Sequence, residues 1–160
     1  MERGWWAAAG VLLWLAAVPM LVGCASAKPA QPPSPVPSGR PVAHAVVTAD
    51  FGAVRGRGFH QGIDLAVPKG SPVWATADGE VVFAGRDGRY GRTVVIDHGG
   101  GYRTRYAHLK KIETERGKRV RRGDVIGRVG KSGRASGPHL HYEVLRNGTP
   151  VEPRPYLDRR

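Results

Sequence analysis

Histidine and carboxylate side chains are the residues of this sequence that could do metal chemistry. Cys24 is the only cysteine, so neither an intramolecular disulfide nor a cysteine zinc cluster can form. The segment His60-Gln61-Gly62-Ile63-Asp64 places a histidine and a carboxylate four residues apart, with a glycine between them that allows a bend. A catalytic zinc takes three nitrogen or oxygen ligands from the protein and keeps a fourth position for water.

A second motif, Pro138-His139-Leu140-His141-Tyr142-Glu143-Val144, holds two more histidines. Residues two apart on a strand point to the same face. Leu140, Tyr142 and Val144 are therefore predicted to face the core. His139 and His141 are predicted to project together from the opposite face, where they could share one site.

Together the two motifs supply a complete ligand set for one zinc ion: His60, Asp64 and either His139 or His141. Such a metal lowers the pKa of its bound water toward about 7 and polarises a carbonyl. The remaining histidine, together with His108, would then be available for proton transfer. Scattered structural histidines are the alternative that the spacing alone leaves open.

The elements that must position these residues are short strands. From about residue 46 to 157, β-branched runs are punctuated by glycine and no helical stripe is sustained, which predicts a single all-β, mainly antiparallel domain. Asp78-Gly79 and Gly99-Gly100-Gly101 are predicted hairpin turns, and Arg122-Gly123-Asp124 a tight turn. The predicted strands cover residues 72–76, 79–84, 93–97, 102–107, 124–129 and 139–145.

Three motifs, His60-Gln61-Gly62-Ile63-Asp64, Tyr106-Ala107-His108-Leu109 and Gly137-Pro138-His139-Leu140-His141, resemble those of the lysostaphin-like (LytM-type) zinc metallopeptidases. The likeness extends over nearly all of the domain, from Asp50-Phe51-Gly52 to Gly130-Lys131-Ser132-Gly133. It implies an antiparallel sheet domain with a groove across the sheet and zinc at its floor.

The same resemblance implies the roles of the site residues. His60, Asp64 and His141 correspond to the ligands of one zinc ion, and His108 and His139 to the catalytic histidines. The family hydrolyses peptide bonds in bacterial peptidoglycan through a zinc-activated water. Members that have lost these residues act instead as regulators that activate a partner cell-wall amidase, and we keep this as the alternative function.

Other polar residues receive plainer interpretations. His98 is interpreted as a turn residue or a partner of a ligand, and His44 as solvated. Glu143 shares the face of His141, and we interpret it as an ordinary strand charge in preference to a partner for a histidine. Tyr90 is interpreted as a packing aromatic, with a place in the groove as the alternative.

The first residues predict export. Glu2 and Arg3 precede an apolar run over 5–22, which is typical of a signal peptide, although an uncleaved anchor is the competing interpretation. Leu21-Val22-Gly23-Cys24 resembles the lipobox of bacterial lipoproteins. That likeness implies cleavage before Cys24 and a lipid anchor on its thiol, so that the chain is held at a membrane of the cell envelope. This would be the outer membrane, facing the periplasm, if the cell has one, and otherwise the outer face of the cell membrane.

The predicted organisation is therefore a lipoprotein signal peptide (1–23), a lipidated cysteine and proline-rich linker (24–45), a peptidase domain (46–157) and a tail (158–160). The net charge is +12, and removal of residues 1–23 leaves it unchanged. Because export separates this charge from nucleic acid, we predict peptidoglycan and the membrane as partners, a partner cell-wall hydrolase as a further candidate, and no nucleic acid. One basic cluster is interpreted as a solvated face, with attraction to an anionic wall polymer as the alternative: Lys110, Lys111, Arg116, Lys118, Arg119, Arg121 and Arg122.

Overall fold

The computed structural model describes residues 35–159 except residue 57. These residues all belong to one of the two contact units of the chain, Pro32–Arg160. The predicted signal peptide (1–23), Cys24 and the linker up to residue 34 lie outside the described residues. Within the described part, no helix has the length and apolar character needed to cross a membrane.

Short strands are the main regular elements of the described chain, as the sequence predicts. They are β1 (Val46–Ala49), β2 (Val54–Arg55), β3 (Gly58–Phe59), β4 (Ile63–Ala66), β5 (Pro72–Trp74), β6 (Gly79–Asp87), β7 (Gly91–Gly99), β8 (Tyr102–Ala107), β9 (Leu109–Ile112), β10 (Arg119–Val120), β11 (Val125–Val129), β12 (Leu140–Arg146) and β13 (Thr149–Val151). A 3₁₀ turn, Gly88–Tyr90, joins β6 to β7, and the short helix α1 (Arg154–Leu157) follows β13.

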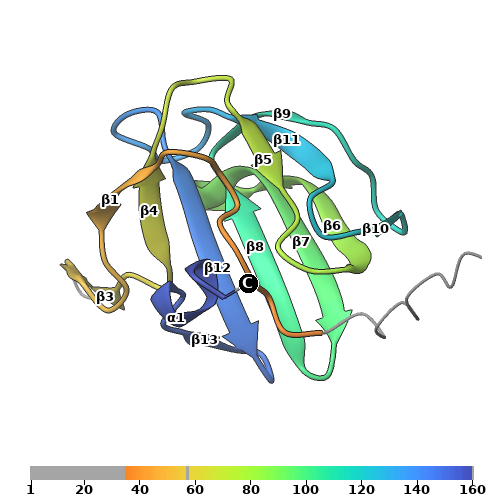
Figure 1. The fold of residues 1–160 in the computed structure, drawn as a ribbon. Coiled ribbons are helices and arrows are strands. Elements are labelled where there is room, and N and C mark those ends of the chain that lie inside the picture. The colour runs from red at the N-terminus through yellow and green to blue at the C-terminus, as the bar shows by residue number, and fades with distance from the viewer. Residues whose placement is uncertain (1–34, 57, 160) are drawn as a thin grey trace, which may run out of the picture. The chain divides into compact units, whose positions relative to one another are not determined.

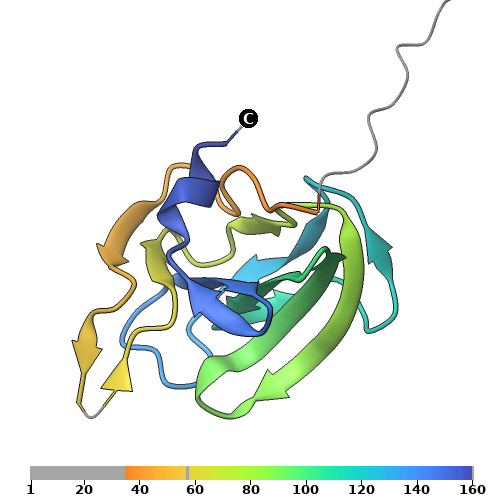
Figure 2. The same ribbon diagram turned by 90° about the horizontal axis from the view of Figure 1, so that it is seen from below.

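The strands form two main sheets, both antiparallel (Figures 1 and 2). The larger sheet has the order β1-β4-β12-β8-β7-β6-β10, and β13 pairs with β12. The smaller sheet has the order β5-β11-β9, and β2 and β3 form a separate hairpin. The predicted all-β, mainly antiparallel fold is confirmed.

One hydrophobic core joins the two sheets. Val94, Tyr106 and Tyr142 of the larger sheet belong to the same buried cluster as Leu109 and Ile126 of the smaller one. On β12, Leu140, Tyr142 and Val144 are all fully buried, as the two-residue period predicts. The opposite face of β12 is therefore free to carry polar side chains.

The turn predictions have mixed outcomes. The triple glycine joins β7 to β8 as an antiparallel hairpin, and Asp124 N–H donates to Arg121 O (3.0 Å) in the predicted tight turn. The hairpin at Asp78-Gly79 is wrong, because β5 pairs with β11 while β6 pairs with β7. Gly79 instead permits close packing, since a Cβ there would lie 2.4 Å from Asp97 O.

His98 is buried at the end of β7, and its burial makes the stability of the fold depend on pH. Its Nδ1 lies 2.7 Å from Asp78 O and its Nε2 lies 2.7 Å from Thr104 Oγ1. Burial lowers the pKa of this histidine below 6.5 in the folded chain. As pH falls below 6.5, the unfolded chain takes up a proton that the folded chain resists, so the free energy of unfolding decreases.

We therefore expect the stability gap between wild type and His98→Gln to narrow as the pH falls from 6.5 toward the folded pKa. The measurement is chemical denaturation of both chains at a series of pH values with a chelator present. The matched control is His44→Gln, which changes an exposed histidine. A gap between wild type and His98→Gln that stays constant across this range would contradict the prediction.

Candidate metal and catalytic centre

Strand β12 lies between β4 and β8 in the larger sheet and fixes the centre of the site. His141 on β12 is directly opposite Asp64 on β4, so the two side chains meet on the same face. On its other side His141 is opposite Ala107, the last residue of β8, and His108 follows immediately. The register thus gathers residues far apart in the sequence.

His60 reaches this centre from the segment before β4. Its backbone is held by segment 50–53, since His60 N–H donates to Ala53 O (2.9 Å) and His60 O accepts from Gly52 N–H (2.9 Å). Its Nδ1 donates to Asp50 O (2.8 Å), which fixes the ring and leaves Nε2 facing the centre.

Three donor atoms converge at the centre: His60 Nε2, Asp64 Oδ1 and His141 Nδ1. The separations are 3.0 Å from His60 to Asp64, 2.9 Å from His141 to Asp64 and 2.9 Å between the two nitrogens. All three residues are buried.

This donor set fits a zinc ion. His60 Nδ1 and His141 Nε2 donate outward, to Asp50 O and to Glu143 Oε1, so the inward nitrogens present lone pairs to each other and to a carboxylate oxygen. Lone pairs crowded in this way repel unless a cation or a proton lies between them. Two imidazole nitrogens and one carboxylate oxygen are ligands that zinc prefers.

His108 and His139 stand beside the three donors. Their rings are 4.8 Å apart between centroids, and His139 Nε2 lies 3.7 Å from Asp64 Oδ1. His108 Nδ1 donates to Ser132 O (2.8 Å) and His139 Nδ1 to Gly137 O (3.0 Å), which leaves each Nε2 able to accept a proton. Burial lowers the pKa of His108, and the neighbouring His139 and His141 lower it further.

His108 also carries an unusual backbone. Its φ is 61°, a left-handed conformation that a non-glycine residue rarely adopts, at the point where the chain leaves β8 for β9. Its N–H donates to Tyr90 O (2.9 Å). Strain of this kind persists only where surrounding contacts hold it, and the contacts to Tyr90 and Ser132 do so here.

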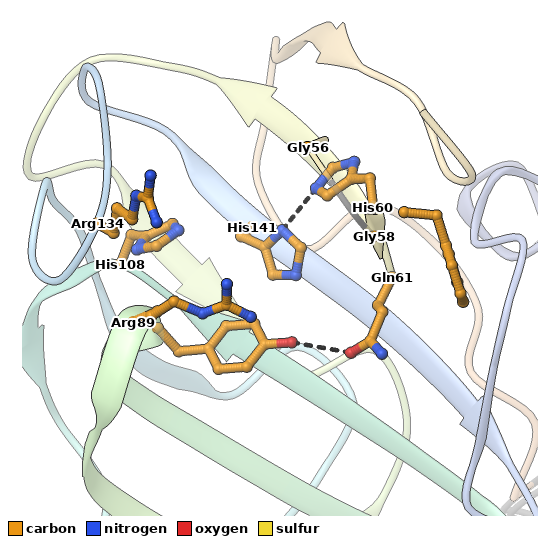
Figure 3. Close-up of a pocket in the computed structure, with 10 residues that line it drawn as sticks. Gly56, Gly58, His60, Gln61, Arg89, His108, Arg134 and His141 are labelled. Atoms are coloured by element: carbon orange, nitrogen blue, oxygen red, sulfur yellow. Dashed lines mark hydrogen bonds between the residues drawn. The ribbon is translucent and has the colours of Figure 1, made fainter. Parts of the chain in front are cut away.

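His60, His108 and His141 line a groove of about 730 Å³ (Figure 3). Residues of the β2–β3 hairpin form one wall, and Arg89, Tyr90 and Arg134 form the other. Tyr90 therefore has the groove-lining place that the sequence left as the alternative. The residues that line it are Gly56, Gly58, Phe59, His60, Gln61, Arg89, Tyr90, His108, Arg134 and His141.

Interpreting Glu143 as an ordinary strand charge is wrong. Its side chain is fully buried. Its Oε1 accepts from His141 Nε2 (2.9 Å) and from the Tyr90 hydroxyl (2.7 Å), while its Oε2 accepts from Arg105 Nη1 (3.1 Å). The Arg105 guanidinium also lies 4.5 Å from the centre of the Tyr90 ring. The two-residue spacing from His141 was the signal in the sequence, but burial of Glu143 depends on Tyr90 and Arg105, which come from other elements.

The electrostatics of this network keep Glu143 ionised. Burial alone would raise the pKa of Glu143, but hydrogen bonds from His141 and Tyr90 and the charge of Arg105 outweigh burial and lower it. Burial, together with the bond to Glu143, raises the pKa of Tyr90 to about 12, so its hydroxyl stays a donor. Burial would lower the pKa of His141, but hydrogen bonds to Asp64 and Glu143 raise it.

The other two histidines lie elsewhere. His98 is buried, forms hydrogen bonds with Asp78 O and Thr104 Oγ1, and does not belong to the donor set. His44 is exposed, as predicted. The described residues thus bring together all five of the predicted site residues, His60, Asp64, His108, His139 and His141.

Gly62 serves close packing between the two parts of the ligand set. A Cβ at this position would lie 2.3 Å from Tyr142 O and 2.9 Å from Glu143 Cγ. We expect Gly62→Ala to push His60 and Asp64 away from β12, destabilising the fold by about 1–3 kcal/mol and weakening zinc binding. Thermal unfolding and zinc titration of the variant measure the two effects.

Gly137→Ala is the matched control for this prediction. Among the residues that the structure describes, a Cβ at Gly137 would meet no atom within 4 Å, although this residue, too, lies beside the site. Zinc affinity in Gly137→Ala should match that of the wild type. Equal losses of zinc affinity in the two variants would show that the close contact between Gly62 and β12 does not position the ligands.

Two curated relatives are similar to this chain over its domain. It is 54% identical over 95 residues to the DD-carboxypeptidase/endopeptidase Mpg of Neisseria meningitidis serogroup B, which is 59% of this chain and 22% of the relative. It is 49% identical over 92 residues to the peptidoglycan DD-endopeptidase ShyA of Vibrio cholerae, which is 58% of this chain and 21% of the relative. The matched part is thus about a fifth of the length of these relatives.

A solved structure and a family model agree with these matches. The crystal structure of a zinc-containing peptidase from Vibrio cholerae matches 76% of this chain and 39% of that one, with a TM-score of 0.66 and 36% identity. The model of peptidase family M23 matches residues 58–153. This match confirms the expected lysostaphin-like (LytM-type) family, and the chain belongs to peptidase family M23.

Proposed function

We propose that this chain is a zinc-dependent endopeptidase that hydrolyses peptide bonds in bacterial peptidoglycan. The observation that carries the proposal is the convergence of His60 Nε2, Asp64 Oδ1 and His141 Nδ1, with His108 and His139 beside them. Membership of family M23 and the names of the endopeptidase relatives support the substrate class.

In this proposal His60, Asp64 and His141 hold one zinc ion. When bound, zinc supplies a Lewis acid for the scissile carbonyl and makes water acidic enough to act as a nucleophile near neutral pH. The single carboxylate of Asp64 leaves a net positive charge in the ligand set, which favours the negative charge that develops on the carbonyl oxygen. Glu143 orients His141 so that Nδ1 faces the donors of Asp64 and His60.

His108 and His139 move protons in this proposal. Each has its Nδ1 committed to a backbone carbonyl, so each presents Nε2 toward the reacting groups. One of them accepts the proton of the attacking water, and the other donates a hydrogen bond to the developing oxyanion or a proton to the leaving amine. Arg89, Tyr90 and Arg134 are placed to bind the polar peptide along the groove.

The proposal for the location of the chain rests on the sequence. We propose that residues 1–23 direct export, that Cys24 carries the lipid anchor and that the proline-rich segment lifts the domain from the membrane toward the cell wall. Mass spectrometry of the chain made in a bacterial host should find a diacylglyceryl group on Cys24. Cys24→Ala should move the chain from the membrane fraction to the soluble fraction.

The test of the activity uses the full chain in detergent with purified sacculi and defined muropeptides. We expect the zinc-loaded chain to release peptide fragments that mass spectrometry identifies, and a chelator to stop the release. His139→Ala should stop release while the zinc content stays at that of the wild type. A zinc-loaded wild type that releases nothing but stimulates a cell-wall amidase would favour the regulatory alternative.

A further inference from the structure

A second cavity, of about 370 Å³, has a strongly basic lining. Its cationic residues come from five places in the chain: the loop before β5, the two facing ends of the β6–β7 hairpin, strand β9 and the loop after β11. Leu109, Ser132 and Gly133 complete the lining. The five cationic residues, called here the basic pocket, are Lys69, Arg86, Arg92, Lys110 and Lys131.

The charges of the basic pocket are not neutralised within the part of the chain that the structure describes. None of its five cations lies within 4.0 Å of a carboxylate there, whereas Arg103, Arg105, Arg128 and Arg154 all form ion pairs. The whole sequence has 13 acidic residues and 25 lysines and arginines. The pocket therefore concentrates positive charge that no described acidic side chain balances.

Two arginines of the pocket face each other directly. Arg86 on β6 and Arg92 on β7 are register partners, and like charges directly opposite on neighbouring strands destabilise a sheet. Arg86 lies two residues beyond Ala84 and Arg92 two residues before Val94, and both of these apolar residues pack in the core. Arg86 and Arg92 therefore lie on the face of the sheet that carries the core residues, just past the last of them. This is the opposite face from the one that carries His141.

We propose that the basic pocket binds a phosphate group. Arginine and lysine donors that approach from five places in the chain suit a tetrahedral anion with several exposed oxygens better than a planar carboxylate, which one arginine fork already satisfies. A bound phosphate would remove the repulsion between Arg86 and Arg92. The inference is independent of the proposed peptidase activity, since it uses none of His60, Asp64 or His141.

The basic pocket adjoins the histidine groove through one segment. Ser132 Oγ accepts from Arg92 N–H (2.8 Å), while Ser132 O accepts from His108 Nδ1 (2.8 Å). Arg89 and Arg134 line the histidine groove, so it too has cations that could attract phosphate. An experiment must therefore separate the two sites.

The experiment is equilibrium dialysis of radiolabelled inorganic phosphate against the full chain in detergent, treated with chelator and held at constant ionic strength. We expect saturable binding of one phosphate per chain. The double variant R86Q/R92Q should weaken it about tenfold or more, because two charge-assisted hydrogen bonds are lost. The matched variant R89Q/R134Q removes the same charge from the histidine groove and should leave phosphate affinity at the wild-type level.

Three results would overturn the proposal: no saturable binding to the wild type, equal loss in the two double variants, or loss in R89Q/R134Q alone. Competition by acetate as strong as that by phosphate would also overturn it, because the pocket would then be a general anion site. Competition by glycerophosphoglycerol would identify phosphodiesters of lipids or wall polymers as the source, and its absence would identify free phosphate.

A stability measurement distinguishes a loss of phosphate binding from misfolding of the variant. In phosphate-free buffer R86Q/R92Q should unfold at the wild-type temperature or above it, because a repulsive pair has been removed. Added phosphate should raise the unfolding temperature of the wild type and of R89Q/R134Q but not that of R86Q/R92Q. A large loss of stability in R86Q/R92Q without phosphate would mean that the arginines hold the fold, and would contradict the proposal.

Discussion

Replacing Asp64 with asparagine (D64N) is expected to abolish stable zinc binding and to lower peptide hydrolysis about 10³-fold, while the chain stays folded. Asp64 Oδ1 is the donor that lies within 3.0 Å of both inward nitrogens, from His60 and His141. It is also the single carboxylate among the three converging donors. The amide of asparagine keeps the shape of the side chain but removes the negative charge that offsets a dication.

The measurement is zinc affinity by competition with a chromogenic chelator, followed by fragment release from muropeptides at equal total zinc concentration. Asp97→Asn is the matched control, because Asp97 is an aspartate on β7 paired with Arg103 outside the groove (2.8 Å). Asp97→Asn should bind zinc like the wild type. Wild-type zinc affinity in D64N would show that the three donors do not form the metal site.

The parts of the site that the sequence predicts are those fixed by a local period. The alternation along β12 places Tyr142 in the core and His141 on the opposite face, because a strand turns each successive side chain over. The choice of His141 over His139 as the third donor came from the family resemblance, and the structure brings His141 Nδ1 to 2.9 Å from Asp64. Spacing alone could not separate these histidines, since both lie on the same side of the chain.

The parts that the sequence does not predict depend on pairing between distant segments. Asp78-Gly79 has the composition of a hairpin turn, yet β5 and β6 do not pair with each other. The chain passes there from the smaller sheet, where β5 pairs with β11, to the larger one. Gly62 suggests a bend, but a Cβ at this position would lie 2.3 Å from Tyr142 O, which is why we expect no side chain to fit there. Both features require knowledge of which strands are neighbours.

Glu143 is the residue for which the dependence on distant segments matters most. Whether a glutamate on a strand is a solvated charge or a buried partner depends on what covers it, and here Tyr90 from the 3₁₀ turn and Arg105 from β8 do so. A buried carboxylate is stable only when its oxygens are hydrogen bonded, and both oxygens of Glu143 are. One of those bonds fixes the proton of His141 on Nε2.

We expect Glu143→Gln to weaken zinc binding about 10–100-fold, the usual cost of losing the partner of a histidine ligand. The glutamine can offer one acceptor, but its NH₂ group would face donors from Tyr90, His141 or Arg105. The negative charge that supports His141 and balances Arg105 is lost as well. Because Glu143 acts through His141, hydrolysis at saturating zinc should recover much more in this variant than in D64N.

Zinc titration, with hydrolysis measured as a function of zinc concentration, separates positioning from a general loss of structure. Glu80→Gln is the matched control, since Glu80 is an exposed glutamate on β6 and its variant should leave both curves unchanged. If Glu143 merely supported the fold, Glu143→Gln would lower the unfolding temperature of the metal-free chain but would leave the zinc affinity of the folded chain intact. A shift of the zinc curve alone would instead place Glu143 in the metal centre, because a carboxylate that only fills space has no means of setting which nitrogen of His141 is free to bind the ion.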